Sequence, residues 1–323
     1  MKNIHNGLIV LGAVIGAGFA TGKEVFVFYA RYGYVGIITA IMSMYLFYIM
    51  VKRYLEVGRL YSDRVYSNRY RLYQGYKAVG LIIVSSALFG AGNEVELCSG
   101  VVGIIILVLT ICLVVGGIDR ISKFNIYIVP IMIIVLICVD GMGIYKNMGE
   151  YDYVYDNNIL FALIKSISYI GINTMLISDI LIDMGKNVSP VKVAMWGSAL
   201  FGSILIFSIT SVMCLPNELV ISDMPLYEMI KGGFISKVYN VLLVIAIITS
   251  VTATIYGVCK YTSKWIRNTK LNVIIVCVMC YLFSLFGFGK IVEYLYPIIG
   301  VLGILYFARL NRIYKSIKIH KTA

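Results

Sequence analysis

Four glycines stand within eleven residues of the first long apolar segment. They belong to the run Gly12–Glu24, which reads Gly-Ala-Val-Ile-Gly-Ala-Gly-Phe-Ala-Thr-Gly-Lys-Glu. Glycine costs about 1 kcal/mol relative to alanine in a helix interior, and backbone groups that are freed inside a bilayer must find new partners. The run therefore predicts a helix that breaks at membrane depth and offers its amides and carbonyls to a ligand. The alternative is close helix packing, because small residues spaced like Gly12 and Gly16 also mark tight contacts.

A second polar stretch, Ala246-Ile-Ile-Thr249-Ser250, lies in the eighth apolar segment. On a helix, the carbonyl of Ala246 and the hydroxyls of Thr249 and Ser250 share one face. A break in the first segment would add the carbonyls of Gly12 and Ile15. Neutral oxygens of this kind suit a hard monovalent cation, so these five residues are a predicted site for such an ion. The alternative is that the two hydroxyls bond to carbonyls of their own helix.

The same break predicts a substrate site. Amides near Ala17, Gly18 and Phe19 would form a helix N-terminus, which favours an anionic group such as a carboxylate. Free carbonyls at the end of the inner half-helix, and at a second predicted break in the sixth segment, would accept an ammonium. A small amino acid or related zwitterion supplies both charges. The other predicted substrate residues are Ser86, Phe89 and Asn93 in the third segment, and Ser168, Tyr169, Gly171 and Asn173 in the sixth. Packing is the alternative role of the polar ones.

Two charged residues within the apolar segments are candidates for a gate. Glu24 and Lys165 both fall toward the external halves of their segments, where ionised groups are costly unless they are paired or face water. We expect them to pair across the external vestibule. A snorkelling surface role for Lys165 is the alternative.

The composition indicates that membrane-spanning helices position these residues. The 323 residues are 60% apolar and 14% charged, with a mean hydropathy of +0.89, which is typical of a polytopic all-α membrane protein. We treat residues 1–323 as a single transmembrane domain. The ten predicted spans are approximately 7–30, 34–57, 78–97, 99–117, 122–144, 158–183, 191–215, 235–259, 271–288 and 290–308.

The basic residues indicate the orientation. Of the 28 Lys and Arg residues, most fall in alternate connections and in the two terminal segments, so the positive-inside rule predicts cytoplasmic termini in the cell membrane. The net charge of +12 is thereby explained by topology, and we expect no nucleic-acid partner. The external segment 216–234 is long enough for a short capping helix, which would act as a lid, or it is a passive surface loop.

Ten spans divide into halves of five, approximately 7–144 and 158–308, with opposite orientation. Glycine-marked polar stretches begin both halves, and interrupted segments at corresponding positions point to a secondary-transporter site. The Gly16–Glu24 run and the Tyr169…Asn173 core resemble the YkvI-type bacterial membrane proteins of the amino acid–polyamine–organocation superfamily, which have the LeuT fold. This resemblance covers essentially all ten spans. It implies a 5+5 inverted repeat, unwound helices one and six, and transport of an amino acid or related solute.

The resemblance also bears on the ion. The 246–250 stretch looks like the sodium site that sodium-coupled LeuT-fold transporters share, where it meets carbonyls of the first helix. Sodium-independent relatives often place a lysine of the fifth helix there, and the interior of the fifth span has none. A second LeuT-type sodium site needs an asparagine just after the break, where this chain has Phe19. We therefore expect one sodium ion as the coupling ion.

These observations predict a sodium-coupled symporter that works by alternating access. A membrane nutrient receptor with a transporter fold, which binds a small ligand and signals without transport, remains open, as does a proton-coupled or facilitative carrier. No enzymatic constellation competes, because both histidines are terminal and no Walker A pattern occurs. The identity of the substrate and the oligomeric state stay open.

Overall fold

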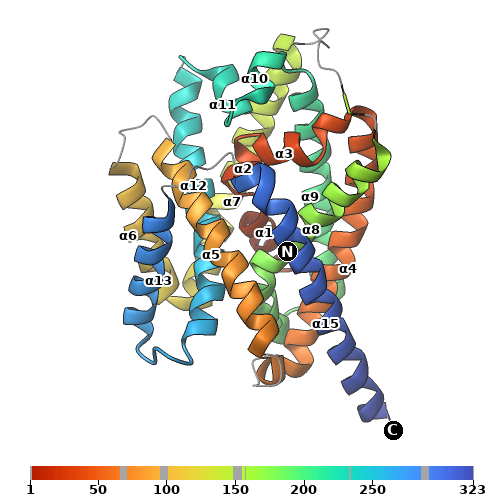
Figure 1. Ribbon diagram of the computed structural model, residues 1–323, viewed down its shortest axis with the longest axis vertical. Coiled ribbons are helices and arrows are strands. Elements are labelled where there is room, and N and C mark those ends of the chain that lie inside the picture. The colour runs from red at the N-terminus through yellow and green to blue at the C-terminus, as the bar shows by residue number, and fades with distance from the viewer. Residues whose placement is uncertain are drawn as a thin grey trace.

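The computed structural model describes residues 2–65, 71–94, 101–147, 155–156, 158–232, 234–284 and 291–322, and the part described is built of helices (Figure 1). In chain order the elements are α1 (Lys2–Val14), α2 (Ala17–Ala20), α3 (Lys23–Phe28), η1 (Ala30–Tyr32), α4 (Gly33–Val65), α5 (Arg71–Glu94), α6 (Val101–Val115), α7 (Gly117–Asn147), α8 (Ile159–Met184), η3 (Gly185–Asn187), α9 (Pro190–Met213), α10 (Asn217–Ile221), α11 (Pro225–Ile230), α12 (Phe234–Thr262), α13 (Thr269–Phe283), η5 (Ile291–Leu295) and α15 (Tyr296–Thr322).

The helices fit a multi-pass membrane protein. Among the described residues, seven helical stretches are long and apolar enough to cross a bilayer, and α6 and α13 are shorter apolar helices. Large apolar side chains are exposed on their outer faces, for example Ile134 of α7 and Leu305 of α15. Since lipid tails are apolar, such faces are compatible with a bilayer.

The predicted break in the first segment is confirmed. α1 ends at Val14, and the backbone of Gly16 is extended, with φ −101° and ψ −170°. The N–H of Ile15 donates to the carbonyl of Leu11 at 2.8 Å, and helical bonding resumes where the N–H of Ala20 donates to Gly16 at 2.9 Å. A second turn separates α2 from α3 at Gly22, whose φ of +82° strongly favours glycine.

The predicted break in the sixth segment is wrong. α8 runs without interruption from Ile159 to Met184 and contains every residue of the expected break. Its polar side chains bond within the helix, since the Asn173 amide donates to the Tyr169 carbonyl at 2.9 Å and the Thr174 hydroxyl donates to the Ile170 carbonyl at 2.7 Å. This is the common behaviour of polar residues in apolar helices.

The single glycine of α8, Gly171, serves helix packing instead. A β-carbon on Gly171 would overlap the carbonyl of Gly300 in α15, and one on Gly303 would overlap the carbonyl of Gly171. A β-carbon on Gly300 would likewise meet the backbone of Ser168. Small residues on both helices thus let two backbones touch, so glycine in α8 marks a crossing and not a break.

The C-terminal half of α8 is held by two ion pairs to neighbouring helices. The Lys77 ammonium of α5 bonds to Asp179 and also donates to the Ser178 hydroxyl at 3.1 Å. One turn further along α8, Asp183 pairs with Lys260 of α12. The Lys77–Asp179 pair is buried, with 4% and 1% of the two side chains exposed.

The 216–234 segment forms two short helices, α10 and α11, as the prediction of a capping helix anticipated. They lie at the upper end in Figure 1, above α2 and α3. The N–H of Leu226 donates to the Thr21 carbonyl at 3.0 Å. The segment therefore contacts the turn between α2 and α3 directly.

Candidate functional site

The break lies against α12 at the predicted sodium site. A β-carbon on Gly16 would overlap the hydroxyl of Ser250, so the two residues are in direct contact. The Ser250 oxygen is buried and has no hydrogen-bond partner among the described residues. A buried polar atom without a partner is uncommon and calls for an explanation. An oxygen aimed at a helix break is available to a cation.

The other four predicted sodium ligands, Ala246, Thr249, Gly12 and Ile15, have different surroundings. The Thr249 hydroxyl donates to the Ala246 carbonyl at 2.9 Å, which is the alternative role that the sequence left open. Gly12 packs against Val129 of α7, where a β-carbon would overlap a methyl group. Ile15 is buried at the end of α1. The glycine that meets α12 is Gly16, which the sequence reasoning did not assign to the ion.

Ala17, Gly18 and Phe19 are buried in α2 at the break. The carboxyl group of Glu24 lies against Gly18, at the position where a β-carbon would stand. Glu24 reaches Gly18 because the left-handed turn at Gly22 folds α3 back toward α2. An acidic side chain thus stands beside the amides that were expected to receive a substrate carboxylate, and its charge favours a cationic group instead.

Two tyrosines complete what we call the Glu24 cluster, defined as Glu24, Tyr169 and Tyr296. Both hydroxyls interact electrostatically with Glu24, and neither forms a hydrogen bond with another described residue. The ring of Tyr169 packs 5.1 Å from that of Phe28 and 5.3 Å from that of Tyr29, between centroids. The cluster is buried, and in the described part of the chain no ion pair neutralises Glu24.

The remaining substrate residues are divided between α8 and α5. In α8, Ser168 and Gly171 pack against α15, and Asn173 bonds to its own helix. In α5, Phe89 packs edge-on against Tyr281 at 5.8 Å. The side chain of Asn93 lies outside the described residues.

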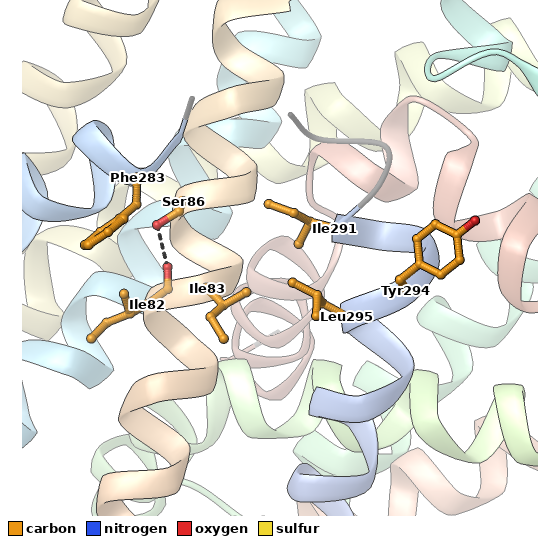
Figure 2. A pocket seen from close by; sticks show the side chains of 7 residues that line it. All are labelled: Ile82, Ile83, Ser86, Phe283, Ile291, Tyr294 and Leu295. Carbon is orange, nitrogen blue, oxygen red and sulfur yellow. Dashed lines mark hydrogen bonds between the residues drawn. The ribbon is translucent and has the colours of Figure 1, made fainter. Parts of the chain in front are cut away.

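Ser86 lines a cavity of about 540 Å³ between α5, α13 and η5. Figure 2 shows its hydroxyl bonded to the Ile82 carbonyl, at 2.8 Å, with Ile83, Ile291 and Leu295 around the opening. The lining is apolar apart from the hydroxyls of Ser86 and Tyr294. This cavity suits an apolar group and offers no charge to a zwitterion.

The predicted gate pair is not formed in this structure. Lys165 lies over the ring of Phe28, with its nitrogen 5.7 Å from the centroid, while Glu24 belongs to the cluster above. The α10–α11 segment is instead held by Lys23, which pairs with Asp223 at 3.4 Å and donates to the carbonyls of Ile221 and Ser222 at 3.1 and 2.9 Å. The neighbouring charges Lys23 and Glu24 thus point to different partners, as two adjacent helical positions must.

Three functional candidates escaped the sequence reasoning: Asp140 in α7, Asp179 in α8 and Tyr296 in α15. The two aspartates carried a signal, because a carboxylate inside an apolar span is costly and is a functional candidate by default. Tyr296 gave no such signal, because nothing in the sequence distinguishes it from the other tyrosines among the 26 in the chain.

Comparison with known proteins confirms the resemblance to the YkvI-type proteins. The uncharacterized membrane protein YkvI of Bacillus subtilis (strain 168) is 22% identical over 325 residues, which cover 94% of this chain and 93% of the relative. The uncharacterized protein YyaD of the same organism is 22% identical over 316 residues, covering 92% of each. No family model matches the chain.

Solved transporter structures share the fold. MhsT in complex with L-phenylalanine superposes with a TM-score of 0.70 at 14% identity, over 94% of this chain and 88% of that one. A Na⁺-coupled sialic acid symporter gives 0.67 at 12% identity, over 94% and 77%. The nucleobase-cation-symport-1 family transporter Mhp1 gives 0.64 at 14% identity, over 90% and 74%. These neighbours are LeuT-fold transporters and not enzymes.

Proposed function

We propose that this chain is a sodium-coupled symporter of a small amino acid or related zwitterion that works by alternating access. The observation that carries the proposal is the contact between the broken first segment and α12, where Gly16 touches the unpartnered Ser250 hydroxyl. The shared fold with Na⁺-coupled transporters supports it. A solute bound at the break could hold the two elements together in one state and release them in the other.

Sodium would bind between α1 and α12. The ligands would be the Ser250 and Thr249 hydroxyls, the Ala246 carbonyl and the carbonyls of Gly12 and Ile15. The Thr249 hydroxyl now donates to the Ala246 carbonyl, but its lone pairs remain free to face a cation. Ser250 is the strongest of the five candidates, because its oxygen is buried and otherwise unused.

The substrate ammonium would bind at the Glu24 cluster. Glu24 is buried beside Gly18, and among the described residues it has no cationic partner, so an amine would neutralise a costly charge. The Tyr169 and Tyr296 hydroxyls would orient the ligand. The substrate carboxylate would face the amides of α2, on the side that Glu24 leaves open. Glu24 thus becomes a specificity residue, in place of its predicted role in a gate.

The architecture that we propose has ten membrane crossings in one domain. The halves, approximately 7–144 and 158–308, would be inverted repeats, with α8 as an unbroken counterpart of the first segment. Both termini would be cytoplasmic, and the α10–α11 segment would cover the external vestibule.

The test is uptake into proteoliposomes that contain the purified full-length chain. A mixture of radiolabelled amino acids and amines is first screened by thermal shift, with and without sodium, and the stabilising compounds are used for flux. We expect accumulation that needs an inward sodium gradient and is lost in the Thr249→Ala, Ser250→Ala double variant. Unchanged uptake in potassium would contradict sodium coupling and favour a proton-coupled or facilitative carrier.

The receptor alternative is separated by the same preparation. A receptor would bind a compound in the thermal-shift screen but would not accumulate it in the vesicles. Glu24→Gln should abolish stabilisation by compounds that carry an amine, while Glu56→Gln, at a partly exposed surface pair, should not change it.

A further inference from the structure

Asp140 of α7 is a buried carboxylate that the proposed transport site does not use. Its side chain is 0% exposed, and the Ser208 hydroxyl of α9 donates to one of its oxygens. Ser211, one turn further along α9, faces the same carboxyl group, and its oxygen also lies beside Gly143 of α7. The second Asp140 oxygen and the Ser211 oxygen both lack a hydrogen-bond partner among the described residues.

The described part of the chain offers Asp140 no counter-charge. No ion pair that the structure records includes it, and the titratable group that faces it from a neighbouring element is the phenol of Tyr239 in α12. α9 presents the two serine hydroxyls. Asp179 shows the contrast, since its equally buried carboxylate is paired with Lys77.

We propose that Asp140, Ser208 and Ser211 form a proton-binding site that is linked to the broken first segment through Tyr239. An ionised carboxylate buried in a membrane without a partner is expensive, and a proton removes the charge. The protonated acid also gains a donor, which the unpartnered Ser211 oxygen can accept. One proton would therefore satisfy both unpartnered atoms.

A metal cation fits this place less well than a proton. Hard cations are usually held by about six oxygens, whereas the side chains here supply two carboxyl oxygens and two hydroxyls. All four come from the continuous helices α7 and α9, and no break lies there to free backbone carbonyls.

The link to the break is a single hydrogen bond. The Tyr239 hydroxyl, an electrostatic neighbour of Asp140, donates to the carbonyl of Ala20 at the end of α2. When Asp140 loses its proton, the new negative charge favours Tyr239 as a donor to the carboxylate. That donation competes with the bond to Ala20, and α2 loses a contact that holds it against α12. Deprotonation would therefore loosen α2.

The site is tested by infrared difference spectroscopy on the full-length protein in lipid. We expect a carbonyl stretching band of a protonated acid at neutral pH that disappears on alkalinisation and is missing in Asp140→Asn. Glu24→Gln is the control that removes the other unpaired buried carboxyl. An Asp140→Asn difference spectrum that shows loss of ionised carboxylate bands at neutral pH would overturn the proton site. So would a band that sodium abolishes, because that result would assign a metal cation to Asp140.

The link is tested by hydrogen–deuterium exchange of the peptide that contains α2, compared at two pH values after correction for intrinsic exchange. We expect exchange to rise several-fold when the Asp140 band has disappeared, and not to change in Asp140→Asn. In Tyr239→Phe the carbonyl band of Asp140 should still disappear on alkalinisation, while the exchange rate of the α2 peptide should no longer change with it. If the exchange rate of the α2 peptide in the wild type does not change with the protonation of Asp140, the link is refuted. Neither readout requires sodium or transport, so the site can fail while the proposed symport holds, and the reverse.

Discussion

The first segment and α8 carry similar sequence signals and form different structures. Both contain glycine among polar residues in an apolar stretch, yet the first breaks at Ile15–Gly16 and again near Gly22, while α8 is continuous. Gly171, the single glycine of α8, faces the backbone of Gly300 and Gly303 in α15, whereas Gly16 and Gly18 face the polar side chains of Ser250 and Glu24. In these two segments, glycine therefore stands at a helix crossing where its neighbour is backbone, and at the helix break where its neighbour is a polar side chain.

The two regions also differ in how firmly they are held. α8 has a buried ion pair in its C-terminal half and close packing on α15 in its middle. Around the first segment, the oxygens of Ser250 in α12, Tyr169 in α8 and Tyr296 in α15 have no hydrogen-bond partner among the residues that the structure describes. We infer that α8 is the fixed wall and that the first segment is the part that responds to ligands.

Breaking the ion pair of the fixed wall should have the largest effect. Lys77→Met leaves Asp179 buried without its partner, which typically costs about 3–5 kcal/mol. The free energy of unfolding, measured by denaturant titration of the purified protein in detergent, should fall by that order. Lys52→Met, at a half-exposed pair with Glu56, is the control and should change little. Equal stability of Lys77→Met and the wild type would show that α8 is not fastened there.

Crowding the helix crossing should cost less. Gly171→Ala forces a methyl group into the Gly300 carbonyl, and overpacking typically costs about 1–3 kcal/mol. The matched control is Gly141→Ala in α7, where the nearest atom to a new β-carbon is 4.0 Å away. Thermal unfolding of the two variants should separate them clearly, and if both melt like the wild type, close packing does not explain the glycine of α8.

Removing the unpartnered hydroxyl should change ligand binding more than stability. Ser250→Ala should weaken sodium-dependent thermal stabilisation by about tenfold in apparent affinity, which corresponds to about 1.4 kcal/mol. Thr249→Ala should have a smaller effect, because that hydroxyl is already bonded to Ala246. Ser263→Ala, at an exposed position just after the end of α12, is the control. The reverse order of Ser250 and Thr249 would refute the site that we propose.

The smallest effect on stability is expected at the contact between Lys23 and the α10–α11 segment. Lys23→Met removes the pair with Asp223, whose side chain is 57% exposed, and the hydrogen bonds to the carbonyls of Ile221 and Ser222. A pair with an exposed partner contributes about 0–1 kcal/mol, and water can replace the lost donor at this exposed segment. The variant should unfold almost like the wild type, yet a protease should cut the α10–α11 segment faster. Cleavage at the wild-type rate would show that Lys23 does not hold this segment down.

Much of the fold could be predicted from the sequence because hydropathy and glycine spacing are local signals. The apolar segments and the first break follow from them, and a short helix in 216–234 is one of the two forms that they allow. The continuity of α8 does not, because Gly171 has the same local context whether its neighbour is Gly300 or a ligand. The position of Glu24 depends on the turn at Gly22. Because the φ of Gly22 is positive, the Glu24 side chain lies beside Gly18 and not at the expected gate.

The contrast between a responsive first segment and a fixed α8 is tested most directly by hydrogen–deuterium exchange of two peptides, one spanning residues 12–22 and one spanning 166–176. In sodium-free buffer the amides of the first should exchange much faster than those of the second, and sodium should slow the first alone. Equal protection of the two peptides, or a sodium effect confined to residues 166–176, would contradict the account.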